Sequence, residues 1–272
     1  MSNPVLEALA LHKAFRGLVA VDEVSFSVRE GTVHALIGPN GAGKTTLFNL
    51  VSGLLPVSAG SLRFLGQDIT GLAAHARARR GIGRTFQNIR IFASMTVLEN
   101  VMTGMSRRLR QPWPLVLLRG GAAGREEATA KQRAHHLLDL VGISEQADRP
   151  AADLAYGDQR RLEIARALAG EPQLLLLDEP AAGMNPTETA GLMALLQKLR
   201  TDGLTILLVE HDMGFVMELS DQITVLNFGR VICEGQPEAV QHDPAVVEAY
   251  LGPKVAQRLL AAKAVKNPQA CP

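Results

Sequence analysis

The sequence has few cysteines and no long apolar run, and both absences narrow what the protein can be. Cys233 and Cys271 are its only cysteines, too few for a disulfide framework or a cysteine-based metal cluster. Because disulfides persist mainly in oxidising compartments, their scarcity favours a reducing, cytoplasmic location. No apolar stretch approaches the roughly 18 residues that indicate a membrane-spanning helix. We therefore expect any role at a membrane to depend on partner proteins.

The sequence also lacks a charge excess and a secretory signal. Its 28 Lys and Arg residues nearly balance 27 Asp and Glu residues, which gives a net charge of +1. Proteins that bind nucleic acids usually carry a basic excess, so we expect no nucleic-acid partner. Residues 1–11 contain no basic stretch followed by an apolar core and a small-residue cleavage site. We expect no secretory signal there.

A phosphate-binding loop is the most informative segment that is present. The pattern G-x-x-x-x-G-K-[ST], with one further threonine, is met by Gly38, Pro39, Asn40, Gly41, Ala42, Gly43, Lys44, Thr45 and Thr46. A strand-like segment, Thr32–Ile37, precedes the loop, and a helix-like segment, Thr45–Val51, follows it. The alternative is a glycine-rich turn without a ligand, but this strand–loop–helix order favours nucleotide binding.

The residue types of the loop suit a triphosphate. Glycines allow successive backbone N–H groups to approach phosphate oxygens, and the following helix N-terminus adds positive potential. Lys44 supplies a mobile positive charge for the β- and γ-phosphates, and the Thr45 hydroxyl suits Mg²⁺.

The rest of the chain alternates strand-like and helix-like segments. Leu174–Leu177 and Thr205–Val209 are continuously apolar, as expected for parallel strands that helices cover on both faces. Leu6–Leu11 and Leu18–Val28 alternate more between apolar and polar residues, as antiparallel strands do. Two further strands are expected at Gln222–Asn227 and Val231–Cys233.

The middle of the chain, about 88–157, is charged, rich in alanine and helix-like. We interpret it as a helical subdomain inserted between two core segments, 1–87 and 158–238. The tail, 253–272, carries basic residues and no acidic one. It is either a frayed basic helix or disordered.

Polar residues follow the apolar strands. Asp178 and Glu179 end one strand, where Asp178 suits Mg²⁺ and Glu179 suits a general base that polarises water. The alternative is a strand followed by an acidic turn. His211 follows another strand, where its ring N–H can reach a γ-phosphate, although such a histidine is more often a surface residue. Gln87 offers an amide oxygen to Mg²⁺ or water, or is a solvated linker residue.

A second anion-binding helix start is expected downstream. Leu154–Gln159 precedes a helix that we place at Gln159–Leu168, and Gly157 permits close backbone approach. Because the chain already has one phosphate loop, this second site suggests a nucleotide held by another subunit.

Five elements follow one another in the chain: the phosphate loop, Gln87, Leu154–Gln159, Asp178-Glu179 and His211. In this order and spacing they resemble an ABC-type ATPase subunit over about residues 5–252. The resemblance makes Gly38–Thr46 the Walker A loop and Leu174–Asp178 the Walker B strand. The catalytic positions that it implies are Lys44, Gln87, Glu179 and His211, with Glu179 as the base, Gln87 as the Q-loop glutamine and His211 as the switch histidine. It implies Mg²⁺ ligands at Thr45, Gln87 and Asp178.

The resemblance adds two further contacts with ATP. Phe15 falls where an aromatic ring stacks on adenine, although a core position would equally explain an aromatic there. The signature loop would contribute Ala155, Tyr156, Gly157, Asp158 and Gln159. The fold class implied is α/β: a P-loop NTPase core with a parallel sheet, an N-terminal antiparallel β subdomain and the inserted helical subdomain. Together these form one ATP-binding domain, 1–252, followed by the basic tail.

Several segments resemble more narrowly the ATP-binding subunits of bacterial branched-chain amino-acid importers: Gly83–Gln87, Met95–Asn100, Leu154–Arg166, Glu179–Pro186, Val209–Met213 and Ala249–Gly252. Similar subunits serve urea and other amides, so the solute stays open. Two departures from the general ABC pattern are Ala155, where serine is usual, and Asn185, where aspartate is usual. Both look usual within this subgroup and do not indicate an inactive ATPase.

The implied function is an ATPase that drives import. Two copies, or this chain and a similar paralogue, would close head to tail over two ATP molecules. Transmembrane permease subunits would be direct partners, and a periplasmic solute-binding protein an indirect one. The implied location is the cytoplasmic face of the inner membrane, as a peripheral subunit.

Three other functions compete with this one. A soluble ABC ATPase of DNA repair or translation usually has long coiled-coil inserts or two cassettes, which this chain lacks. A lipid or lipopolysaccharide exporter ATPase has a similar short form, but Thr85-Phe86-Gln87 and the signature favour the amino-acid type. A P-loop kinase leaves Gln87, the signature and His211 unexplained.

Overall fold

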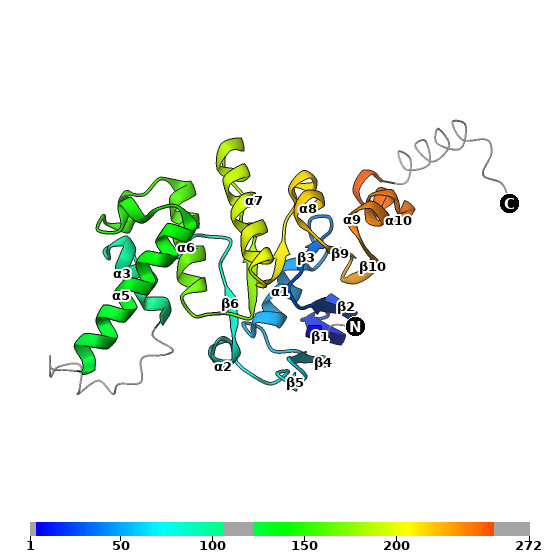
Figure 1. Ribbon diagram of the computed structural model, residues 1–272. Helices are drawn as coiled ribbons and strands as arrows, with labels where there is room; N and C mark the ends of the chain where they lie inside the picture. Colours follow the sequence, from blue (N-terminus) through cyan, green and yellow to red (C-terminus); the bar gives the residue numbers. More distant parts are fainter. Residues whose placement is uncertain (1–3, 106–121, 253–272) are drawn as a thin grey trace. The chain divides into compact units, whose positions relative to one another are not determined.

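A computed structural model describes residues 4–105 and 122–252 (Figure 1). The predictions for the tail, 253–272, fall outside these residues. The chain divides into two compact units, of which the first combines Met1–Leu72 with Leu207–Pro272 and the second is Ala73–Ile206. The helical subdomain expected at about 88–157 falls within the sequence range of the second unit, and its separate identity stays a prediction.

An antiparallel sheet forms one part of the first unit. Its strand order is β2-β1-β4-β5, with the bounds β1 Pro4–Phe15, β2 Leu18–Arg29, β4 Ala59–Phe64 and β5 Gln67–Asp68. Leu6 in β1 lies opposite Val28 in β2 and Phe64 in β4, and all three side chains are buried. The N-terminal antiparallel strands are therefore confirmed, although β1 is longer than the expected Leu6–Leu11.

Parallel pairing in the same unit positions the phosphate loop. Strand β3 (Val33–Ile37) pairs in parallel with β9 (Gln222–Asn227), and β10 (Arg230–Gly235) runs antiparallel to β9. Every residue of β3 is buried. The loop then connects β3 to α1 (Lys44–Ser52), as the sequence predicts. The unit also contains α8 (Met213–Leu219), α9 (Pro237–His242) and α10 (Pro244–Leu251).

The second unit combines a parallel strand pair with helices. Strand β6 (Ile82–Arg84) pairs in parallel with β7 (Leu174–Asp178), whose five residues are all buried. Three helices pack against one another and lie together in Figure 1: α3 Val97–Gly104, α5 Ala122–Val141 and α6 Tyr156–Leu168. The remaining elements are α2 Ala74–Arg80, the 3-10 turns η2 Ser144–Gln146 and η3 Ala151–Asp153, and α7 Pro186–Thr201.

The boundary between the units falls within β8 (Thr205–Val209), a fully buried strand. None of the helices in the described ranges is both long and apolar enough to cross a membrane.

Two sequence predictions need correction. The helix placed at Gln159–Leu168 begins at Tyr156, with Ala155 as its N-cap residue. Gly157 lies in the first turn of this helix, although glycine has a low helix propensity. The short strands β4, β5 and β6 were also not predicted, because they contain too few residues to show a clear alternation.

Asn185 begins α7 with a reciprocal capping box. Its side-chain Oδ1 accepts the Glu188 backbone N–H at 3.0 Å, and the Glu188 carboxylate accepts the Asn185 N–H at 2.9 Å. These bonds satisfy two donors that a helix start otherwise leaves unpaired. The departure to asparagine at this position therefore keeps the capping function of aspartate.

We predict that Asn185→Ala lowers the melting temperature by a few degrees, because losing an N-cap costs about 1 kcal/mol. Asn185→Asp is the matched control, since a carboxylate oxygen accepts the same N–H. Thermal unfolding followed by circular dichroism compares the variants. Equal losses in both would show that the capping bond is not what matters at this position.

His34 is a buried histidine in β3. Its Nε2 lies 2.8 Å from the Thr224 hydroxyl in β9. Burial lowers the pKa of His34 from 6.5 to about 3, so the ring is neutral at physiological pH. The imidazole of His34 therefore binds a proton more readily in the unfolded chain than in the folded one. The contribution of the neutral His34 to stability is fully present above about pH 6.5. That contribution is lost as the pH falls from 6.5 towards 3.

We predict that His34→Gln reduces the drop in melting temperature between pH 7 and pH 5. One such group changes the free energy of unfolding by up to about 1.4 kcal/mol per pH unit. Exposed His75, replaced in the same way, is the control and should leave the pH dependence unchanged. An identical drop in His34→Gln and the unmodified protein would contradict the assignment.

Candidate nucleotide site

Glycines shape the phosphate loop because side chains do not fit there. Gly38, Gly41 and Gly43 have φ angles of 150°, 80° and 101°, in the region that favours glycine. A Cβ atom at Gly38 would collide with the Leu226 carbonyl oxygen, and one at Gly43 with the Ala20 carbonyl oxygen. The loop therefore lies directly against the backbone of neighbouring strands, and these contacts restrict its shape.

Donors at the loop are arranged to receive an anion. The N-cap of α1 is Gly43, which makes no side-chain capping bond, so its first N–H groups lack that partner. The Lys44 ammonium donates to the carbonyls of Gly38 at 2.6 Å and Pro39 at 3.0 Å, and Thr45 is exposed. Backbone donors, a curled lysine and an exposed hydroxyl fit a bound phosphate chain.

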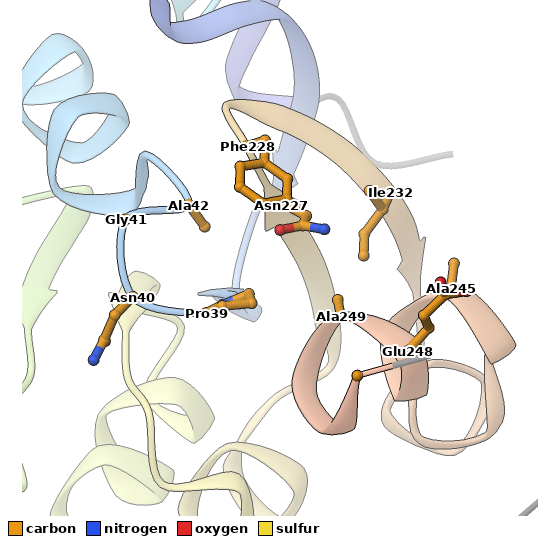
Figure 2. A pocket seen from close by; sticks show the side chains of 11 residues that line it. Pro39, Asn40, Gly41, Ala42, Asn227, Phe228, Ile232, Ala245, Glu248 and Ala249 are labelled. Atoms are coloured by element: carbon orange, nitrogen blue, oxygen red, sulfur yellow. The ribbon is translucent and has the colours of Figure 1, made fainter. Parts of the chain in front are cut away.

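The last helix of the described residues, α10, lies beside the same loop. A pocket of about 470 Å³ separates Pro39–Ala42 from Glu248 and Ala249 of α10, with Phe228 at its edge (Figure 2). Burial raises the pKa of Tyr250, and a hydrogen bond with the Gly38 backbone partly opposes this rise. The end of the described chain thus contacts the first glycine of the loop.

Phe15 and His211 are both accessible in the first unit. Phe15 ends β1 with 42% of its surface exposed, and the Lys13 ammonium lies 5.4 Å from its ring centroid. His211 follows β8, and its backbone N–H donates to the buried Glu210 carboxylate at 3.1 Å. Its side chain is 63% exposed. Its Nδ1 lies 3.7 Å from the same Glu210 carboxylate. Both rings are accessible to a ligand, and both roles stay predictions.

In the second unit, Asp178 ends the buried strand β7. Its carboxylate accepts a hydrogen bond from the Arg84 guanidinium at 3.1 Å, and Arg84 ends the neighbouring strand β6. Burial raises the pKa of Asp178, and the Arg84 charge opposes that rise. An anionic oxygen at a strand end suits a hard cation. The sequence analysis did not identify Arg84, because it lies 94 residues from Asp178 in the sequence and no local pattern reveals the contact.

Glu179 is held in an uncommon conformation next to Asp178. Its φ of 47° is left-handed, which is unusual for a residue with a side chain and is typical of functional sites. The Gln87 side-chain amide donates to the Glu179 carboxylate at 2.9 Å. The structure thus brings together two residues that lie far apart in the sequence and that were both predicted to be catalytic.

The signature segment is the start of α6. Ala155 makes no side-chain capping bond there, so the first N–H groups of the helix lack that partner. Gly157 is buried, and a Cβ atom there would lie 2.7 Å from a Glu188 carboxylate oxygen. Tyr156 donates to the Ala182 carbonyl, Gln159 to the Leu154 carbonyl, and Asp158 accepts from Gln146. An uncapped helix start suits an anion.

The predicted residues are divided between the two units. The first unit contains Phe15, Gly38–Thr46 and His211, and the second contains Gln87, Ala155–Gln159, Asp178 and Glu179. The first unit offers the phosphate loop, and the second offers the strand-end carboxylates and the start of α6. Sequence reasoning missed Arg84, Arg160 and Glu163, although charged residues spaced three apart on α6 were a signal for the last two.

Comparison with known proteins assigns the family. Residues 21–182 match the family model described as ABC transporter, which is more than half of the chain. The chain belongs to this ABC transporter family. Residues 230–252 match a second model, described as branched-chain amino acid ATP-binding cassette transporter. As a cassette of this family, the chain is an ATPase that energises transport.

Two relatives cover nearly the whole cassette. It is 47% identical to the high-affinity branched-chain amino acid transport ATP-binding protein BraF of Pseudomonas aeruginosa, over 93% of this chain and 99% of that protein. It is 35% identical to the lipopolysaccharide export system ATP-binding protein LptB of Escherichia coli K12, over 91% of this chain and 97% of that protein.

Solved structures show the same fold. An ABC transporter cassette in its ADP conformation has a TM-score of 0.80 and 33% identity, covering 93% of this chain and 100% of that one. A dimeric cassette in a post-hydrolysis state, bound to ADP and phosphate, has a TM-score of 0.70 and 26% identity, covering 85% and 98%. The predicted ABC ATPase fold is confirmed.

We predict that Lys44→Ala abolishes ATP hydrolysis and weakens nucleotide binding at least about tenfold, because the charge facing the phosphates is lost. Fluorescence titration and phosphate release measure the two effects. Lys198→Ala, which removes an exposed lysine of α7, is the control and should leave both unchanged. Comparable affinity and turnover in a folded Lys44→Ala would refute the loop assignment.

Proposed function

We propose that the cassette is the ATP-hydrolysing subunit of an importer for branched-chain or related amino acids. The observation that carries the proposal is the match of residues 230–252 to the branched-chain amino acid cassette model. This match lies outside the part shared with ABC cassettes in general, 21–182. The 47% identity with BraF, against 35% with LptB, supports an importer over a lipopolysaccharide exporter.

ATP and Mg²⁺ are the proposed ligands. The loop Gly38–Thr46 would hold the phosphates, with Lys44 near the β- and γ-phosphates and the Phe15 ring against adenine. Thr45, Gln87 and Asp178 would hold Mg²⁺, which supplies positive charge for the phosphate oxygens. Uncapped N–H groups at α1 and a carboxylate at the end of β7 support these roles.

The catalytic roles follow from the side chains themselves. Glu179 would accept a proton from the attacking water, and its position is set by a left-handed backbone and the hydrogen bond from Gln87. His211 would donate a ring N–H to the γ-phosphate; its side chain is 63% exposed, and its Nδ1 lies 3.7 Å from the Glu210 carboxylate. The single observation that supports the Glu179 role is its contact with Gln87 beside the Asp178 carboxylate.

A second cassette is the proposed partner at the signature segment. The start of α6 offers uncapped donors, and one chain needs only one phosphate loop for its own nucleotide. We therefore expect two copies, or this chain with a similar paralogue, to close over two ATP molecules, with Ala155–Gln159 of each facing the other's nucleotide. Permease subunits would hold the pair at the cytoplasmic face of the membrane, and a periplasmic solute-binding protein would act through them.

Affinity purification of the tagged chain from host membranes, followed by mass spectrometry, tests the importer proposal. Co-purification of two permease proteins whose deletion abolishes branched-chain amino-acid uptake supports it. Co-purification of lipopolysaccharide-transport proteins instead would assign the chain to the exporter class. Recovery of DNA-repair or translation factors would point to a soluble ABC ATPase.

We predict that Glu179→Gln binds ATP but hydrolyses it at least about a hundredfold more slowly, as expected when a general base is lost. With ATP and Mg²⁺ it should accumulate as a closed dimer, which size-exclusion chromatography with light scattering detects. Glu218→Gln, which changes an exposed carboxylate of α8, is the control for loss of one negative charge. Near-normal turnover and an unchanged monomer–dimer distribution would count against the role.

A further inference from the structure

A buried ion pair on α6 holds the segment that carries Gln87. The side chains of Arg160 and Glu163 are 2% and 1% exposed, and Arg160 Nη1 lies 3.1 Å from Glu163 Oε2. Buried charges of this kind add little net stability, because desolvation offsets most of their attraction. Their value lies in the specific geometry of the bonds that they make.

Arg160 holds the carbonyl side of the Gln87 segment. Its Nη1 donates to the Phe86 carbonyl at 2.6 Å, and its Nη2 donates to the Gln87 carbonyl at 2.5 Å. The planar guanidinium places two donors in a fixed fork, which a lysine ammonium does not reproduce. Both carbonyls are therefore tied to one rigid side chain on α6.

Glu163 holds the N–H side of the same segment. Its Oε1 accepts the backbone N–H groups of Phe86 at 3.4 Å and Arg90 at 3.3 Å. Burial raises the pKa of Glu163, and these donors with the Arg160 and Arg166 charges oppose the rise. One ion pair thus clamps both polar edges of the backbone around Gln87.

The clamp connects two parts of the ATPase site. Arg160 lies one turn after Tyr156, whose hydroxyl is 3.4 Å from Arg160 Nη2, so it moves with the start of α6. Gln87, in turn, donates its side-chain amide to Glu179. Hydrogen bonds therefore connect the signature segment to the Glu179 carboxylate through Arg160 and Gln87.

We propose that Arg160 is a positioning residue for ATP hydrolysis, which acts through Gln87 on Glu179. Glu163 supports it by fixing the same backbone. The inference rests on the catalytic role proposed for Glu179, and it adds that the signature helix sets the place of that base within its own chain. In this role Arg160 acts through its bonds to the Phe86 and Gln87 carbonyls rather than on the nucleotide directly.

A double-mutant cycle between Arg160→Lys and Gln87→Ala tests the proposal. Arg160→Lys alone should lower kcat at least about tenfold and leave the KM for ATP within about twofold. In the Gln87→Ala background, the same change should lower kcat less than about twofold, because the residue that transmits its effect is gone. Full, multiplicative losses in the double variant would overturn the proposal, as would an unchanged kcat in folded Arg160→Lys.

Arg161→Lys is the matched control on the same helix. Arg161 donates to the Val141 carbonyl at the end of α5, away from the Gln87 segment in the sequence. The same conservative change one residue away should leave kcat within about twofold. A loss equal to that of Arg160→Lys would mean that a general weakening of α6 packing, rather than positioning of Gln87, explains the effect.

Hydrogen exchange separates this inference from the catalytic proposal. In the nucleotide-free chain, Arg160→Lys and Glu163→Gln should each speed amide exchange in residues 86–90 and leave β7 protected. This readout does not depend on Glu179 being the base, whereas normal hydrolysis by Glu179→Gln would refute that role alone. If Arg160→Lys does not fold, Glu163→Gln replaces it in the cycle. Unchanged exchange at 86–90 in folded variants would overturn the clamp.

Discussion

The proposed catalytic residues of the second unit depend on one constraint: two carboxylates stand at the end of a buried strand. Strand β7 is buried along its whole length, and Asp178 at its end has almost no access to water. This burial raises the pKa of Asp178. Such a group needs nearby donors to stay anionic. The Arg84 guanidinium supplies one donor to Asp178. The Gln87 amide donates to the neighbouring Glu179 carboxylate and fixes its position.

The phosphate loop, in contrast, depends on glycines, which have no side chain. Gly38 and Gly43 approach neighbouring backbone so closely that no Cβ atom fits, and α1 begins without a side-chain cap. Its donors are fixed backbone groups, which need no reorganisation when an anion arrives. The start of α6 repeats this arrangement, because Ala155 makes no side-chain capping bond. Serine at that position would add a hydroxyl, whereas alanine leaves the backbone donors to act by themselves.

Inside the second unit, the Arg160–Glu163 pair connects the start of α6 to the Gln87 segment, which contacts Glu179. Its bonds reach from the signature helix to the backbone on either side of Gln87. Buried charged pairs are poor sources of stability but good sources of unique geometry. This explains why a helix that could be packed with apolar residues instead buries an arginine and a glutamate. The same logic applies to Asn185, where an exposed side chain fixes the start of α7 by capping rather than by packing.

The sequence by itself determined the phosphate loop, the buried strands and the residue types of the site, because these depend on local patterns. A glycine-rich loop between an apolar strand and a helix has one common use, and continuous apolar runs require cover on both faces. The sequence placed the start of α6 at Gln159 instead of Tyr156. Gly157, in the first turn, has a low helix propensity and so gives no local signal of a helix. Only the tertiary structure showed that Arg160 meets the Phe86 carbonyl across 74 residues of sequence and that Arg84 meets Asp178 across 94. These pairings follow from burial and strand alignment, which bring distant side chains together without leaving a periodic signal in the sequence.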